Sequence, residues 1–350
     1  MQGLNITAAE AVTAIGLTAA TTAAAVRAGI NRVSASELYP DVEGYPLSVA
    51  LLPNDDGFVE PFDRMGPAAL QALRTLMRVF SPGHDHGRPC HLLLGGAHPD
   101  RGGALYSSPE DLLPVALASE LTQWFGPTPV QVFPQGNPSA MFALVAAAEI
   151  LQRDPRSVCI VGAVDSLLDA ELLERFEEEG RLTSEGHGCP HGLTPGEAAG
   201  FLVVESARVQ CPRPPLALIE SVAVGHERHP YTSEDPSLGE GLSDVCWRAM
   251  LEARVDRGEV DAVLIDLDGE HHRALEWAYA EVRRLGPREP ARTIVHPAEG
   301  YGSIGAASGV LLLAIAAESR GWLDGVDLVL AADDEGPRGA AVVRRQWRGH

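Results

Sequence analysis

Short apolar runs alternate along this chain with longer segments rich in helix-forming residues. The apolar runs predict buried strands, at residues 4–8, 46–52, 91–95, 216–223 and 260–269. The longer segments predict helices, at residues 18–27, 67–80, 241–256 and 271–285. Strands that alternate with such helices are typical of mainly parallel sheets covered by helices on both faces. The pattern therefore predicts an α/β protein.

Flanking residues mark the ends of two helices. Gly29 follows the helix predicted at 18–27, and glycine readily adopts the left-handed conformation that often ends a helix. Further along, Ser108 precedes Pro109 and Glu110. Because serine caps helix amides and proline suits the first helical position, we expect another helix to begin there.

A repeat is the main organising feature of the chain. Residues 131–204 contain a Gly-rich turn, an Ala/Leu helix, a strand and, after an insertion, a closing strand. Residues 299–344 repeat this order in shorter form. Such a duplication predicts two similar halves whose buried helices start at one shared cleft. The residues expected at these two helix starts are Asn137 and Ser303.

The repeat and a Pro-rich link at 211–215 divide the chain. We expect an N-terminal half at 1–210, with an insertion at about 167–196, and a C-terminal half at 216–350. The acidic segment 171–179 inside the insertion is interpreted as a solvated helix face.

Charge and composition argue against two classes of partner. The 350 residues include 27 Lys and Arg against 48 Asp and Glu, a formal net charge of −21. This charge repels phosphate backbones and anionic membranes. Only 5% of the residues are aromatic, which disfavours a stacking surface for single-stranded nucleic acid. We expect neither nucleic acid nor a membrane as a partner.

The N-terminus and the cysteines indicate a cytoplasmic protein. The Ala-rich run at 8–28 follows no basic region and contains Glu10, so it does not resemble a signal peptide. No window offers the ~20 apolar residues needed to span a bilayer. The five cysteines are scattered and odd in number, which predicts no disulfide framework.

Four segments resemble the thiolase superfamily and, within it, the β-ketoacyl synthases. Residues 6–30 (ITAAEAVTAIGLTAATTAAAVRAGI) resemble the ketosynthase start, and residues 161–186 (VGAVDSLLDAELLERFEEEGRLTSEG) resemble the V-G-G-V-D-S block. Residues 195–206 (PGEAAGFLVVES) are similar to the G-E-G-A-G strand, and residues 305–317 (GAASGVLLLAIAA) to the helix after the second catalytic histidine. The resemblance covers nearly the whole chain in order. It implies a thiolase-like fold, with two similar halves in a layered α-β-α-β-α arrangement.

The residues that do chemistry in this family are different here. The resemblance aligns Asn137 with the cysteine that attacks the acyl donor, Asp266 with the first catalytic histidine and Ser303 with the second. Ala298 stands at the lysine, and residues 334–340 replace a Gly-rich gating motif. The resemblance therefore implies a ketosynthase-like protein that lacks the Cys-His-His catalytic set.

The substituted residues predict little chemistry. Asn137 has no nucleophilic atom and precedes Pro138, so we interpret it as an N-cap. Ser139 is the nearest hydroxyl, but neither aligned histidine remains to act as its base. An ionised Asp266 would oppose an enolate, whereas an Asp266 protonated by burial could donate a hydrogen bond. We interpret Asp266 as a polar strand end that faces a remodelled cleft.

Two loops contain residue types that bind zinc. The weak candidates are His84, His86, Cys90 and His91 in one loop and His187, Cys189 and His191 in the other. Neither spacing matches C-x-x-C or H-E-x-x-H, so we favour polar loops without metal and expect no cofactor. His271 and His272 lie close to the aligned site, and we favour a surface pair over a new catalytic base.

Three functions remain open at this stage. One is a non-catalytic scaffold, adaptor or chaperone-like accessory protein. A second is a subunit that resembles the chain-length factors and pairs with an active ketosynthase. The third is an acyltransferase of the 3-oxoacyl synthase type that uses other residues.

The family resemblance also implies an assembly. It implies a homodimer formed through a central strand of the first half, for which residues 157–164 or their neighbours would supply the surface. A ketosynthase, an acyl carrier protein or a secretion-related protein is considered as a further partner.

Overall fold

Each half of the chain forms a sheet of the same topology. The computed structural model describes residues 3–53, 60–80, 87–183, 191–209, 214–319 and 325–345. The strands of the first half are β1 (Leu4–Thr13), β4 (Cys90–Gly96), β5 (Val130–Pro134), β6 (Val158–Ser166) and β7 (Glu197–Ser206). Those of the second half are β8 (Ala217–His226), β9 (Val260–Ile265), β10 (Thr293–Val295), β11 (Gly325–Ala332) and β12 (Pro337–Arg345).

The order of these strands repeats between the halves. From the middle outward the order is β1-β7-β6-β4-β5 in the first half and β8-β12-β11-β9-β10 in the second. In both halves the second strand of this order is antiparallel to its two neighbours, and the outer pairs are parallel. The repeat seen in the sequence is therefore part of a duplication of the whole sheet.

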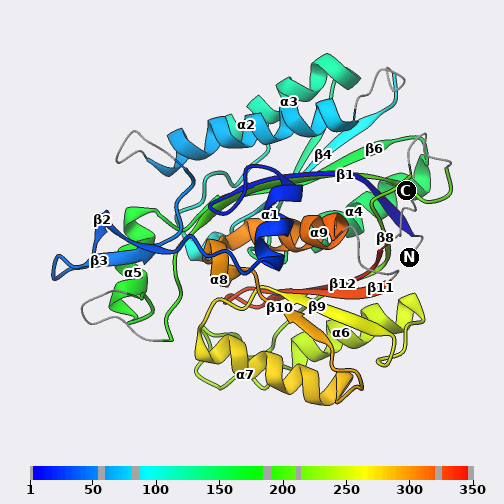
Figure 1. Ribbon diagram of the computed structural model, residues 1–350. Helices are drawn as coiled ribbons and strands as arrows, with labels where there is room; N and C mark the ends of the chain where they lie inside the picture. Colours follow the sequence, from blue (N-terminus) through cyan, green and yellow to red (C-terminus); the bar gives the residue numbers. More distant parts are fainter. Residues whose placement is uncertain are drawn as a thin grey trace.

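Helices separate the two sheets and cover their outer faces (Figure 1). The helices α4 (Ser139–Arg153) and α9 (Ser308–Glu318) lie between the sheets, and α1 (Ala19–Arg27) packs beside α9. Every residue of α9 is buried, because apolar and small side chains occupy all of its faces. The outer helices are α2 (Pro61–Phe80) and α3 (Leu112–Phe125) on the first half, and α6 (Glu240–Ala253) and α7 (His271–Ala280) on the second. The expected α/β fold with α-β-α-β-α layers is confirmed.

The sheets of the two halves join through β1 and β8 into one ten-stranded sheet, the main sheet. Residues 4–6 of β1 pair with residues 217–219 of β8, which leaves β5 and β10 as the outer strands. Of the residues expected to supply a dimer surface, those of β6 have both strand edges occupied, by β7 and β4, so only the neighbours of β6 remain as candidates. The outer strand of the first half is β5.

One predicted strand lies outside the main sheet. Residues 46–52 contain β3 (Pro46–Val49), which pairs with β2 (Ser34–Pro40) in a separate two-stranded sheet. The apolar side chains of this hairpin pack with those of α5 (Ala170–Glu178) in a small separate core. On α5 the apolar side chains Leu172 and Phe176 are buried, which agrees with a helix whose acidic face is solvated.

The predicted helix boundaries are partly correct. Thr18 caps α1, and Gly29 follows it with a φ of 64°. The helix α3 begins later than predicted, at Leu112, with Asp111 at its N-cap position. The carboxylate of Asp111 instead accepts hydrogen bonds from the preceding amides of Ser107 and Ser108, which closes a turn before the helix. In the described part of the chain no helix is both long and apolar enough to cross a membrane.

Candidate functional site

The starts of α4 and α9 meet at the centre of the molecule. The carbonyl of Asn137 accepts a hydrogen bond of 3.0 Å from the amide of Gly309. The amide of Asn137 donates to Asp333 Oδ2 at 3.1 Å. In the matching contact, the amide of Ala306 donates to Asp165 Oδ2 at 2.7 Å. Each half therefore supplies a turn that binds the carboxylate at a strand end of the other half.

Glycines make these two exchanged contacts possible. Gly136 and Gly305 have positive φ values of 62° and 52°. A Cβ at Gly136 would overlap the carboxylate of Asp333, and a Cβ at Gly305 would overlap that of Asp165. Both positions therefore require glycine for two reasons, the backbone conformation and the close approach.

The structure corrects the residues expected at the two helix starts. By its contacts, Ala306 is the counterpart of Asn137, and α9 begins at Ser308. Ser303 lies between α8 (Ala298–Tyr301) and a 3-10 turn, where its amide donates to the carbonyl of Thr194 at 2.7 Å. The alignment placed Ser303 correctly in the loop before the helix, but this 3-10 turn separates it from the helix itself.

Asn137 is not an N-cap. The N-cap position of α4 is occupied by Pro138, whose side chain makes no capping hydrogen bond. The side-chain amide of Asn137 instead donates to Asp266 Oδ2 at 2.9 Å. This hydrogen bond is stronger than one between neutral groups, because its acceptor is charged.

Asp266 is a buried and paired carboxylate. Its Oδ2 lies 2.8 Å from Arg273 Nη2 and also accepts the amide of Ala332 at 3.1 Å. Its Oδ1 has no hydrogen-bond partner among the described residues. Asp266 and Arg273 are 6% and 4% exposed, so the pair lies in the interior. The interpretation of Asp266 as a polar strand end stands, with Arg273 as the partner that the sequence did not indicate.

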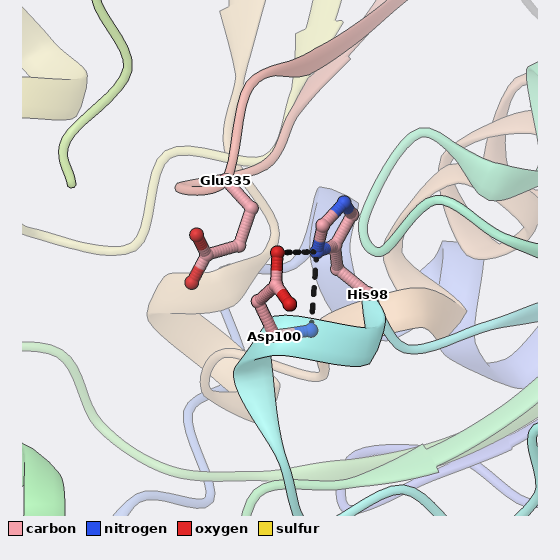
Figure 2. Close-up of side chains that lie close together, drawn as sticks. All are labelled: His98, Asp100 and Glu335. Atoms are coloured by element: carbon pink, nitrogen blue, oxygen red, sulfur yellow. Dashed lines mark hydrogen bonds and ion pairs between the residues drawn. The ribbon is translucent and has the colours of Figure 1, made fainter. Parts of the chain in front are cut away.

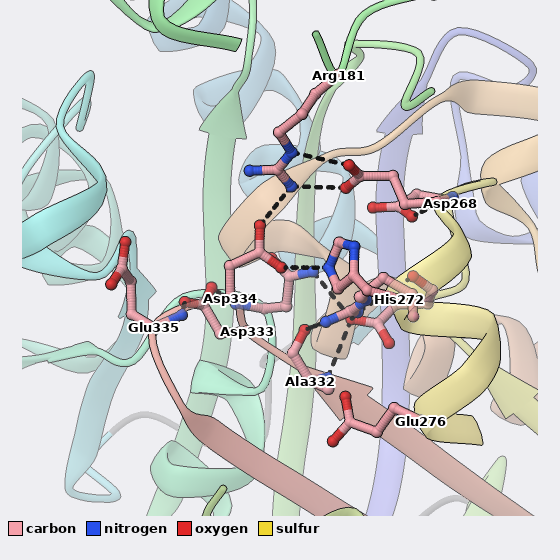
Figure 3. A network of polar contacts seen from close by, with 12 residues as sticks. Arg181, Asp268, His272, Glu276, Ala332, Asp333, Asp334 and Glu335 are labelled. Carbon is pink, nitrogen blue, oxygen red and sulfur yellow. Dashed lines mark hydrogen bonds and ion pairs between the residues drawn. The ribbon is translucent and has the colours of Figure 1, made fainter. Parts of the chain in front are cut away.

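A network of charges lies beside this pair (Figure 3). Arg181 binds Glu270 through two hydrogen bonds of 2.8 and 2.6 Å, and also contacts Asp334 at 2.5 Å. Asp334 lies between Arg181 and His272, whose Nε2 is 3.2 Å from Asp334 Oδ1. The ring of Tyr231 stacks on both, with centroid distances of 4.4 Å to the His272 ring and 4.4 Å to the Arg181 guanidinium. His272 therefore belongs to the site, and the expectation of a surface pair holds only for His271, which is exposed.

The carboxylates of the network differ in proton affinity. Burial raises the pKa of Asp268 to about 6, and the nearby carboxylates of Glu270 and Asp334 add to this shift against the opposing charge of Arg273. Burial also disfavours ionisation of Asp334. The hydrogen bond from His272 and the charges of Arg181 and Arg273 outweigh this effect and hold the pKa of Asp334 well below its usual range. The carboxyl of Asp268 is thus less acidic than an ordinary aspartate, and that of Asp334 is more acidic.

The space left at the site is small. A cavity of about 110 Å³ is lined by side chains of this network and by Asn137, Ser303 and Arg101. Arg101 is itself held by two hydrogen bonds to Asp165, of 2.6 and 2.9 Å. Small-molecule sites usually have volumes of ~300–1,000 Å³. The charged side chains therefore fill most of the room between the helix starts.

Neither Ser139 nor a described cysteine lines this cavity. Ser139 is fully buried and its hydroxyl donates to the carbonyl of Ala306 at 3.2 Å. The described cysteines Cys90, Cys159 and Cys246 are buried elsewhere, and burial raises the pKa of each thiol. A reactive cysteine needs the opposite shift.

Among the described residues, the sequence-predicted metal candidates do not form a cluster of ligands. Cys90 and His91 belong to β4, where Cys90 packs in the apolar core of the first half. The described residue of the second loop, His191, is exposed. His84, His86, His187 and Cys189 lie outside the described residues.

Two other groups of side chains have metal-ligand chemistry in the described residues. One comprises His98, Asp100 and Glu335 (Figure 2), where Asp100 lies between His98 and the side chain of Glu335. The Nδ1 of His98 already accepts the amide of Asp100 at 3.3 Å. The other group comprises Glu270, His272 and Asp334, but Arg181 binds both of its carboxylates. A guanidinium thus already neutralises the charge that would attract a cation.

The sequence pattern did not indicate the arginines of the site. Arg101 and Arg181 lie 64 and 89 positions along the chain from Asp165 and Glu270, which they bind. Arg273 lies only seven positions from Asp266, but arginine occurs throughout the sequence and its position alone does not indicate a partner. One signal was present for the carboxylates: Asp165 and Asp333 occupy matching positions in the two copies of the repeat.

Comparison with solved structures shows the same fold. The chain matches one from the type II polyketide synthase complex AntDE:AntF, an acyl-carrier protein with its ketosynthase bound to the hexaketide, over 99% of both chains, with a TM-score of 0.79 and 16% identity. It matches the ishigamide ketosynthase/chain length factor over 99% of both chains, with a TM-score of 0.76 and 15% identity. The oxazolomycin ketosynthase domain of Streptomyces albus matches with a TM-score of 0.75 and 13% identity, over 100% of this chain and 75% of that one.

These matches define the class of fold. The chain has the thiolase-like fold of ketosynthases and chain length factors. No family model matched the sequence, and a search of curated proteins found no match either. At such low identity the likeness extends to the fold, and function has to be argued from the site.

Proposed function

We propose that this protein is a non-catalytic, ketosynthase-like scaffold or adaptor. The contact between Asn137 and Asp266 carries the proposal. Where the family resemblance implies a thiol beside an imidazole, an amide donates to a carboxylate whose bonded oxygen already contacts Arg273 and the amide of Ala332. The contacts engage Asp266 Oδ2 with three donors, and neither the Asn137 amide nor the paired carboxylate offers a nucleophile to a substrate.

The small cavity supports the same proposal. A non-catalytic protein needs no room for an acyl chain, and the space of about 110 Å³ is bordered by paired arginines and carboxylates. Such buried ion pairs are costly to open, since removal of one partner leaves an uncompensated charge. They stabilise the junction of the two halves instead.

A scaffold of this fold acts through its surface, and we propose a homodimer formed along β5. This strand is at one end of the main sheet, and its side chains are half-buried or exposed. An open strand edge pairs readily with another chain. A subunit that resembles the chain length factors and pairs with an active ketosynthase is the second candidate, because a ketosynthase/chain length factor is among the matching folds.

The decisive test is for a covalent acyl intermediate. The purified protein and its Asn137→Cys variant are incubated with acyl-CoA and acyl-carrier thioesters, and their intact masses are recorded. We expect no adduct on either, because the carboxylates of Asp266 and Asp333 beside position 137 disfavour a thiolate. An acyl adduct on the wild-type protein would overturn the non-catalytic assignment.

Light scattering tests the proposed assembly. We expect twice the chain mass of 37.1 kDa, and a shift toward the single chain for Val132→Lys in β5. Val115→Lys, at an exposed position of α3, is the control and should leave the mass unchanged. A stable complex with an active ketosynthase, formed in place of the homodimer, would favour the second candidate.

A further inference from the structure

A large groove lies at the outer edge of the second half, beside β10. Its volume is about 810 Å³, which lies within the ~300–1,000 Å³ typical of small-molecule sites. It shares no lining residue with the cavity between the helix starts. A ligand site in this groove is therefore independent of the function proposed from the cavity.

The walls of the groove are largely apolar. They include Leu264 of β9, Ile294 and Val295 of β10, Ile315 of α9 and Ile30 after α1. Ile30 is 47% exposed, and Ile294 and Val295 are half-buried, so hydrocarbon surface faces the groove. Covering such surface is favourable by roughly 25 cal/mol per Å². The walls suit the apolar body of a ligand.

A buried carboxylate also lines the groove. Asp327 of β11 is 2% exposed, and its Oδ2 lies 3.1 Å from Arg345 Nε. Its Oδ1 has no hydrogen-bond partner among the described residues. Buried polar atoms without a partner are rare because each one costs free energy. A ligand that donates a hydrogen bond at this place would remove that cost.

The buried carboxyl of Asp327 favours a cationic donor. Two aspartates line the groove and each is paired with an arginine, Asp327 with Arg345 and Asp261 with Arg288. Burial raises the pKa of Asp327 to about 7, with Asp261 adding to the shift and Arg345 opposing it. A positively charged donor stabilises the ionised form of this carboxyl and makes a stronger hydrogen bond to it than a neutral donor does, whereas an anionic head group makes no such bond.

We propose that this groove binds an apolar amine, with its hydrocarbon body against the β10 wall and its ammonium group donating to Asp327 Oδ1. The amine is a ligand and undergoes no reaction in this proposal. Because the carboxylate has two oxygens, Arg345 keeps its contact with Oδ2 while the ligand uses Oδ1.

Calorimetric titration with three probes tests the proposal. Decylamine, decanol and decanoate share the hydrocarbon chain and differ in the head group, and about 0.15 M salt screens non-specific attraction to the acidic protein. We expect saturable binding of one decylamine per chain, at least about tenfold tighter than binding of decanol or decanoate. Equal affinity for the three probes, or no saturable binding of decylamine, would overturn the proposal.

Variants locate the bound probe. Asp327→Asn should weaken decylamine binding by about tenfold or more and leave decanol unchanged, because only the charge is removed. Ile294→Trp should weaken both probes by filling the groove. Asp244→Asn, on the exposed face of α6, is the matched control and should change neither. If Asp327→Asn does not fold, the Ile294→Trp variant still tests the location of the probe, and the comparison of head groups on the wild-type protein still tests the preference for an amine. Unchanged decylamine binding in a folded Asp327→Asn or Ile294→Trp variant contradicts the assignment.

Discussion

The side-chain amide of Asn137 donates a 2.9 Å hydrogen bond to Asp266, which lies 129 positions further along the chain in the other half. The same carboxylate oxygen lies 2.8 Å from Arg273 and accepts the amide of Ala332. Three donors thus converge on one oxygen from three segments of the chain. The contact makes the centre of the molecule a structural junction of the halves.

Removal of this amide should weaken that junction. For Asn137→Ala we expect a loss of about 1–2 kcal/mol in the free energy of unfolding, because Asp266 keeps two of its three donors. For Asn137→Asp we expect a larger loss near neutral pH than in mild acid, since a third carboxylate would adjoin Asp266 and Asp333. Urea denaturation measures both. Wild-type stability for Asn137→Ala would show that the hydrogen bond is dispensable.

Gly136 should tolerate no side chain. Gly136→Ala introduces a Cβ that overlaps the carboxylate of Asp333, in addition to the strain of a φ of 62°. Gly180→Ala is the matched control, because its φ is 66° and nothing lies within 4 Å of the added Cβ. The control should lose about 1 kcal/mol, and Gly136→Ala clearly more. Urea or thermal unfolding measures both variants. An equal loss of stability in the two would mean that the overlap with Asp333 costs nothing beyond the strain of the positive φ.

Arg181 should be among the most sensitive charges of the molecule. Arg181→Met leaves the buried carboxylate of Glu270 without its cation and removes one of the positive charges beside Asp334, and we expect a loss of about 3–5 kcal/mol. Arg153→Met is the control. Its ion pair with Glu149 is on the surface, with 79% of the arginine side chain exposed, and surface pairs contribute about 0–1 kcal/mol. Similar stabilities of the two variants in urea would contradict the predicted role of the network.

Asp268 should make stability depend on pH. Its pKa is about 6 in the folded protein, against about 3.9 for an unperturbed aspartate. The folded state therefore binds more protons than the unfolded state between these values, and the free energy of unfolding falls as the pH rises through this window. Asp268→Asn removes this contribution. Its stability relative to wild type should rise from about pH 4 to about pH 6 and then level off.

The control for this pH dependence is Asp244→Asn, whose carboxylate is exposed on α6. Its stability relative to wild type should show no such rise over the same window. A flat difference for Asp268→Asn as well would mean that the carboxyl ionises as readily in the folded protein as in the unfolded chain.

Local pattern in the sequence accounts for much of the fold. Apolar runs located β4, β8 and β9, and the two copies of the repeat located α4, β6 and β7 together with α9, β11 and β12. Residues 46–52 show where this reasoning stops. Their pattern predicts a strand correctly, but a short apolar run does not reveal whether its partner is the main sheet or, as found, β2.

The sequence by itself determined the duplication and the layered α/β fold, and it predicted Asn137, Asp266 and Ser303 at the positions of the family's catalytic residues. Tertiary structure alone decided what these residues touch. It showed that Ala306, and not Ser303, is the counterpart of Asn137 at the second helix start. It also placed Arg273 beside Asp266 and Arg181 beside Glu270. The physical reason is range: the periodicity of a strand or helix depends on neighbouring residues, whereas contacts such as Asn137 with Asp266 and Arg181 with Glu270 form only where the two halves pack together.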